Sequence, residues 1–126
     1  MAESFNHFGS IADALPKVLG QVVRKTALVV QARAASAAPV DTGFLRNSIY
    51  TVTSEGSSYQ GGEKALPPIS DTPDQTTAYV AVGANYGVFV ELGTRYKPAK
   101  PYFFQAVEAT RGPFEAACSR IEDLLK

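Results

Sequence analysis

The feature that most constrains the fold is a long apolar stripe near the start of the chain. Its members recur at the three- and four-residue spacing of one helical face, with charged and polar side chains largely between them. They are Leu15, Val18, Leu19, Val22, Val23, Thr26, Val29 and Val30. An alanine-rich stretch continues the pattern until Pro39 stops it. We therefore expect one helix from Pro16 to Ala37, about 33 Å long, with its stripe packed in the core.

The residues that follow predict a turn and then strands. In the tetrapeptide Val-Asp-Thr-Gly, the side chains of Asp41 and Thr42 can bond nearby backbone N–H groups, and Gly43 tolerates positive φ. This composition is typical of a tight reversal in which Asp41 stabilises the turn. The β-branched and aromatic residues of 48–54 and 76–83 then predict two strands.

Two segments lack a packing pattern. Residues 55–75 are rich in Ser, Gly and Pro and have little periodicity, which predicts a long loop that is mobile in the free protein. Residues 1–10 precede the apolar stripe, and we expect them to form a flexible arm. With 126 residues, the whole chain is expected to be a single domain (1–126).

The last third of the chain predicts two more helices. From Ala84 the pattern fits either a strand or a short helix, and we favour a helix because Asn85 can cap it and Gly93 can end it. The C-terminal segment is also helical, with a break or kink at the dipeptide Gly112-Pro113. The expected fold class is α+β: a long N-terminal helix and a C-terminal helix packed on a small, mostly antiparallel sheet.

Composition narrows the function classes. The 12 basic residues balance 12 acidic ones, whereas nucleic-acid-binding proteins usually carry a basic excess. A single cysteine, Cys118, cannot form an internal disulfide, and we expect it to be buried on the last helix. Neither a signal peptide nor an apolar run long enough for a membrane span is visible, so we expect synthesis in the cytoplasm.

The sequence offers little for catalysis. His7 is the only histidine, so a histidine-based triad or a zinc site has little support, and Cys118 has no second histidine to activate it. Asp41 and Glu91 could act as a catalytic carboxylate pair if they met in space. We favour the interpretation that Asp41 stabilises the turn and that Glu91 lies on the surface or at an interface. The Gly-Gly-Glu-Lys segment lacks the spacing of a phosphate loop. We predict no enzymatic activity, no metal and no cofactor.

One basic cluster could bind nucleic acid. Arg95, Lys97 and Lys100 alternate with Tyr96 and Tyr102, a combination that can touch phosphates and stack on bases. Three charges make a small footprint, and we favour a solvated linker or a protein interface at this position.

The ordered set of motifs resembles the small neck and tail-completion (head–tail joining) proteins of long-tailed bacteriophages. The matching segments run from Pro39 to Ile49, from Tyr86 to Thr94, and from Ala99 to Val107. The motif residues that the resemblance marks as an interface are Asp41, Thr42, Gly43, Leu45, Arg46, Tyr86, Phe89, Glu91, Gly93, Thr94, Pro101 and Phe103. Two features depart from the family pattern: the 55–75 loop has no counterpart, and Gly87 stands where alanine is common.

The resemblance implies a structural virion protein of the tail or neck. It would form a ring with copies of itself, a hexamer by the sixfold symmetry of tails or a dodecamer, and contact head-closure, tail-terminator or tail-tube proteins. DNA would pass only as cargo in the channel, and no membrane would be involved. Arg46 and Glu91 each follow a motif turn or short helix, and each could pair with an opposite charge on a neighbouring subunit. The alternative is a monomeric binding or regulatory module of phage origin without a virion role.

Overall fold

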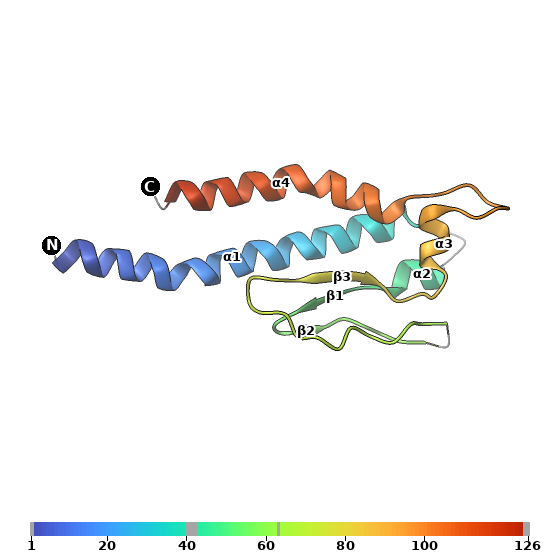
Figure 1. Cartoon of the computed structure of the whole chain (residues 1–126), viewed down its shortest axis with the longest axis horizontal. Coiled ribbons are helices and arrows are strands. Elements are labelled where there is room, and N and C mark those ends of the chain that lie inside the picture. The colour runs from blue at the N-terminus through green and yellow to red at the C-terminus, as the bar shows by residue number, and fades with distance from the viewer. Residues whose placement is uncertain (1, 40–42, 63, 125–126) are drawn as a thin grey trace.

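The N-terminal helix is longer than the sequence predicts. The computed structural model describes the backbone of residues 2–39, 43–62 and 64–124, and in it helix α1 spans Ala2–Ala37. The expected start at Pro16 is therefore wrong, and residues 2–10, assigned to an arm, have helical backbone. A proline inside a helix removes one hydrogen bond, which a bend can accommodate. The axis of α1 changes direction in its first half (Figure 1).

The C-terminal helix α4 (Tyr102–Leu124) runs antiparallel along α1 (Figure 1). Small side chains make the close contact, since Ala34 and Ala106 are both buried. The expected break at the Gly-Pro dipeptide is wrong, because α4 continues through Pro113. Both Pro113 and Ala109 are exposed, so this stretch lies on the solvent side of the helix, where water can replace a lost hydrogen bond at lower cost.

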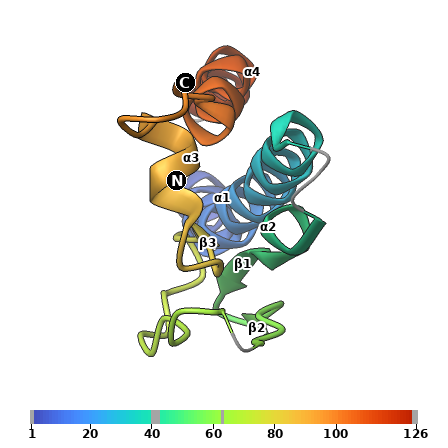
Figure 2. The same ribbon diagram turned by 90° about the vertical axis from the view of Figure 1, so that its right-hand side faces the viewer.

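A three-stranded antiparallel sheet lies below α1, in the order β2 (Gly56–Ser57), β1 (Ile49–Thr53), β3 (Tyr79–Val82). Both predicted strands are confirmed, and their register pairs Ile49 with Val82. Figure 2 shows the layers, with α4 above α1 and α1 above the sheet. The first four residues of β1 are buried, so the central strand is covered on both faces. The predicted α+β class is confirmed.

The segment between β2 and β3 covers the far face of the sheet. Tyr59 packs edge-on against Tyr50, with 5.1 Å between ring centroids, and the Tyr50 hydroxyl accepts a hydrogen bond from Ile69 N at 3.3 Å. The end of the segment crosses α1 closely: a Cβ on Gly20 would lie 2.4 Å from the Gln75 carbonyl oxygen. The loop that the sequence predicts is thus anchored at several points, although it is nearly free of regular structure.

Two short helices complete the fold. Helix α2 (Gly43–Ser48) was not predicted, and residues 40–42, where the sequence predicts a turn, lie outside the described residues. Helix α3 (Gly87–Leu92) confirms the helical reading of this segment. The predicted cap is wrong, since Tyr86 precedes the first helical residue and no side chain caps the helix. Its end is as predicted, with Gly93 at φ 80°.

Candidate assembly site around helix α3

The motif segments that are far apart in sequence meet at Gly87. Leu45 from α2 is completely buried there, and a Cβ placed on Gly87 would lie 3.3 Å from the Leu45 Cδ1 atom and 2.6 Å from Val82 Cγ1. Only glycine fits this packing without a shift of its neighbours. Glycine at position 87, where the resemblance led us to expect alanine, therefore has a local structural reason, and the role of Leu45 is core packing.

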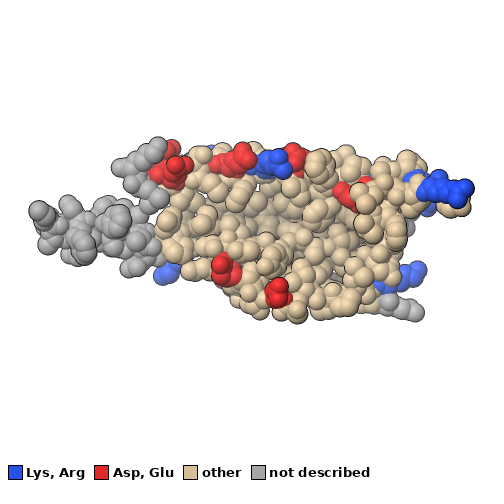
Figure 3. Space-filling model, in the orientation of Figure 1, with Lys and Arg blue, Asp and Glu red and all other residues tan. Residues whose placement is uncertain are grey.

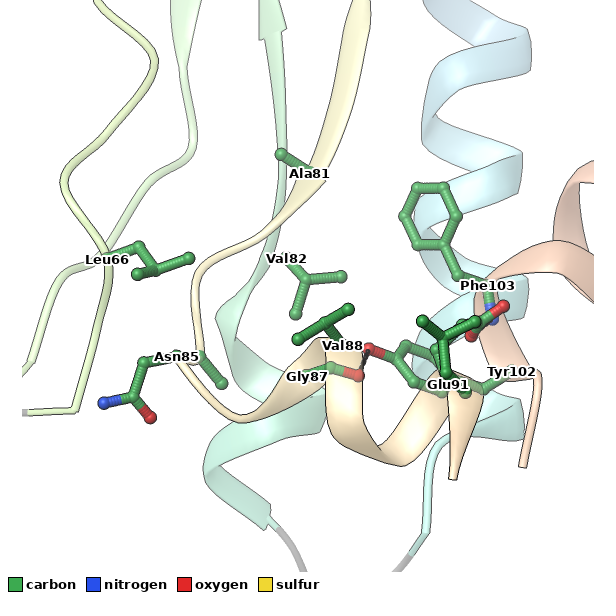
Figure 4. Close-up of a pocket in the computed structure, with 11 residues that line it drawn as sticks. Leu66, Ala81, Val82, Asn85, Gly87, Val88, Glu91, Tyr102 and Phe103 are labelled. Carbon is green, nitrogen blue, oxygen red and sulfur yellow. Dashed lines mark hydrogen bonds between the residues drawn. The ribbon is translucent and has the colours of Figure 1, made fainter. Parts of the chain in front are cut away.

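Tyr102 closes this junction from the side of α4. Its hydroxyl donates a hydrogen bond to the Gly87 carbonyl at 3.1 Å, and the residue is buried (Figure 4). Burial is the main cause that raises the pKa of Tyr102 to about 12, and the charges of Glu91 and Tyr86 act in the same direction. Tyr102 is therefore a structural residue, so the aromatic surface of the basic cluster is reduced to Tyr96.

Arg46 and Ser48 hold α2 in place. The Arg46 Nη2 atom donates to the Ala38 carbonyl just after α1, at 3.2 Å, which satisfies a carbonyl group of the helix end. The Arg46 Nε atom is buried and has no hydrogen-bond partner in the described part of the chain. The Ser48 hydroxyl donates to the Leu45 carbonyl at 2.7 Å and accepts from Ala84 N at 3.0 Å, joining α2 to the end of β3.

Glu91 has a role that the sequence did not reveal. Its two carboxylate oxygens accept hydrogen bonds from the backbone N–H groups of Phe103 and Phe104, each at 2.9 Å. These N–H groups belong to the first turn of α4, which has no helical partners for them. Pro101 stands just before the helix and has no side-chain acceptor, so Glu91 caps α4 from α3. The expectation that Glu91 is free to pair with a neighbouring subunit does not fit this geometry.

Gly93 and Thr94 shape the connection from α3 to α4. A Cβ on Gly93 would lie 2.7 Å from Ala99 N, so glycine permits both the positive φ and the close approach of the returning chain. The Thr94 hydroxyl accepts from the N–H groups of Tyr96 and Lys97, at 3.2 and 3.1 Å. The result is a tight protruding loop, residues 94–101, which we call the basic hairpin.

The outer surface of α3 is apolar. Val88, Phe89 and Leu92 are 54%, 59% and 72% exposed, and Phe104 at the start of α4 is 60% exposed. Of these four, only Phe89 was among the predicted interface residues. The signal that would have found the others is their spacing, because residues 88, 89 and 92 share one face of a helix whose other side is fixed by Gly87. We call these four residues the α3 apolar face.

Two grooves border this face. One, of about 350 Å³, is lined by Leu66, Val82, Val88 and Leu92, and its wall includes Glu91 and Phe103 (Figure 4). The Asn85 side chain points away from it in this view. A second groove, of about 380 Å³, lies on the other side, between Phe89 and the lysines of the basic hairpin. The first groove is lined mainly by apolar side chains, whereas Lys97 and Lys100 border the second, and both are open enough to take a protein side chain or segment.

The described residues hold no group of three or more His, Cys, Asp or Glu side chains that could bind a metal ion. The expectation that Cys118 is buried is wrong, since this free cysteine is only half-buried on α4. No helix within the described ranges is both long and apolar enough to cross a bilayer. An exposed apolar helix face beside a charged loop is what a protein offers when it acts through contacts with other macromolecules.

Such a surface is typical of a site that binds another protein, and comparison with known families shows the class to which the chain belongs. A family model described as "Bacteriophage HK97-gp10, putative tail-component" matches residues 6–93. The chain therefore belongs to the HK97-gp10-like family of phage tail components. Neither the curated proteins nor the solved structures give a match. The family match ends at Gly93, so the hairpin and α4 lie beyond it.

Proposed function

We propose that this phage structural protein is a neck or tail-completion protein that forms part of the ring at the head–tail junction. Two observations support the proposal. The family is one of phage tail components, and the α3 apolar face offers a surface for contact with another protein. Large apolar side chains exposed together on one short helix are costly in water and are typical of protein interfaces. This exposed face is the observation that carries the proposal.

In the proposed ring each copy contacts its neighbours through two different patches, the arrangement that closes a ring by rotation. Sixfold symmetry is favoured and twelvefold symmetry is the alternative. The flanking partners would be head-closure, tail-terminator or tail-tube proteins, and the virion would be the site of action. The motif residues Arg46, Glu91 and Gly93 contribute by fixing α2, α3 and α4 in the geometry that presents the apolar face.

The test replaces an exposed residue that the monomer does not need. Leu92→Asp should leave the purified protein folded, with an unchanged melting temperature, because Leu92 is 72% exposed. In the phage the same change should reduce infectious particles and leave heads and tails unjoined, or tails with faulty ends, in electron micrographs. Leu28→Asp is the matched control, since Leu28 is 58% exposed on α1, away from α3, and should support normal assembly.

Two outcomes would count against the proposal. Normal particles from the Leu92→Asp phage would remove the α3 apolar face from assembly. Normal, infectious particles after deletion of the whole gene would remove the virion role itself and leave the alternative, a monomeric binding or regulatory module of phage origin.

A further inference from the structure

The basic hairpin carries a concentrated positive charge. Arg95, Lys97 and Lys100 lie within six residues, and the sequence from Leu92 to Val107 contains no Asp or Glu. Within the part of the chain that the structure describes, the one ion pair joins Glu108 to Arg111, on α4. Among the described residues, none of the three hairpin cations therefore forms an ion pair with a carboxylate, although the chain as a whole carries no net charge.

The hairpin is also held in one shape. Thr94 N donates to the Lys97 carbonyl at 2.9 Å, and Lys100 N donates to the Val90 carbonyl at 2.9 Å, so both arms are fixed. The Thr94 hydroxyl braces the tip, as described above, and Pro98 restricts the backbone further. A loop ordered before binding loses less conformational entropy when it meets a ligand.

The positive tip stands clear of the rest of the molecule. The hairpin projects past the ends of the helices at one end of the long axis, and blue side chains extend there in the space-filling view (Figures 1 and 3). Tyr96 is 85% exposed, and the Arg95 guanidinium carbon lies 5.9 Å from the centre of its ring. Arginine presents a planar set of donors that matches the oxygens of a phosphate group.

We propose that the basic hairpin binds the phosphate backbone of double-stranded DNA. Cations concentrated on a projecting and polar loop suit a dense line of phosphates, whereas a protein partner would be expected to use the α3 apolar face next to it. Three phosphate contacts give weak binding by one copy. In the ring of the proposed function, several hairpins would act on one duplex and raise the apparent affinity. The contact made by a single copy does not depend on the ring.

The salt dependence of binding measures the number of contacts. We would titrate the full chain into a fluorescent duplex of mixed sequence and follow anisotropy at several salt concentrations. Three neutralised phosphates predict a slope of about −2.7 in a plot of log K against log salt, or about a 40-fold loss of affinity between 50 and 200 mM. The dissociation constant at physiological salt is expected on the order of 10⁻⁴ M.

A charge-matched pair of variants locates the site. Replacing Arg95, Lys97 and Lys100 together by Gln should lower the affinity at least tenfold and bring the salt slope close to zero. The control replaces three exposed lysines elsewhere by Gln and changes the net charge equally. These are Lys17, Lys25 and Lys64. The control protein should keep most of the affinity and the slope, and circular dichroism should show both variants folded.

Three results would overturn the inference. The first is no binding of the duplex by the wild-type chain at low salt. The second is an equal loss in both triple variants, which would show an effect of net charge alone. The third is hairpin-dependent binding of poly-glutamate as tight as that of DNA, which would assign the hairpin to an acidic protein. The Leu92→Asp phage could still show unjoined heads and tails if any of these three results were obtained. The DNA-binding proposal and the head–tail junction proposal can therefore fail independently of each other.

Discussion

The capping of α4 by Glu91 yields the sharpest test of the structure. Glu91→Ala removes the acceptor of two backbone N–H groups in the first turn of a 23-residue helix. A lost cap costs about 0.5–2 kcal/mol, and hydrogen bonds to a charged group contribute about 1.5–3 kcal/mol. Because one of the two bonds is exposed to solvent, we expect the free energy of unfolding to fall by about 2–3 kcal/mol.

The measurement is chemical denaturation of the purified chain, with a melting curve beside it. For a domain of this size, 1 kcal/mol shifts the melting temperature by about 3–6 °C, so Glu91→Ala should melt about 6–18 °C lower. Glu91→Gln should cost about 1 kcal/mol, because the amide keeps one acceptor oxygen but loses the charge that favours a helix N-terminus. Glu91→Lys should destabilise the monomer more than Gln does.

The control is Glu115→Ala, which removes an exposed carboxylate from the same helix and should change stability by less than about 0.5 kcal/mol. If the Glu91 and Glu115 variants unfold at the same denaturant concentration, the cap does not contribute. Glu91 would then be available for contact with another subunit, as the sequence had suggested.

Other positions test the connections around this site. Gly93→Ala should cost more than about 1 kcal/mol in a denaturant titration, since φ is 80° and the new Cβ would lie 2.7 Å from Ala99 N; wild-type stability would contradict the positive φ. The raised pKa of Tyr102, about 12 against 10.0, means that its stabilisation is complete below pH 10 and is lost as pH rises through 12. Between pH 10 and 12, Tyr102→Phe should therefore lose less of its free energy of unfolding than the wild type does. If the two proteins show the same dependence of stability on pH, burial of Tyr102 is not the cause. Gly20→Ala should displace the Gln75 carbonyl from α1 and speed proteolytic cleavage of the loop over the sheet, whereas an unchanged digestion pattern would show that the contact is dispensable.

The two long helices, strands β1 and β3, and helix α3 could be predicted from the sequence because each depends on local chemistry, whereas the short elements α2 and β2 were missed. The apolar stripe predicted the long helix, β-branched residues predicted β1 and β3, and a glycine with positive φ marked the end of α3. The errors came where local signals are weak. Pro16 and Pro113 are poor markers of helix ends here, because a proline costs one hydrogen bond and packing along the rest of a long helix can offset it.

The roles of the motif residues were decided only by the tertiary structure. The sequence marked Leu45, Arg46 and Glu91 together as interface residues. In a sequence, a charged residue next to a turn cannot be distinguished as one that binds a partner or one that binds the chain's own backbone. Folding places Glu91 at the N-terminus of a helix that begins eleven residues later, and places Leu45 against Gly87. The same packing turns Val88 and Leu92 outward, because the opposite side of α3 must be glycine to fit. Which residues are left for other molecules therefore follows from long-range contacts. The spacing of 88, 89 and 92 places them on one helix face, but only the packing at Gly87 decides that this face is the exposed one.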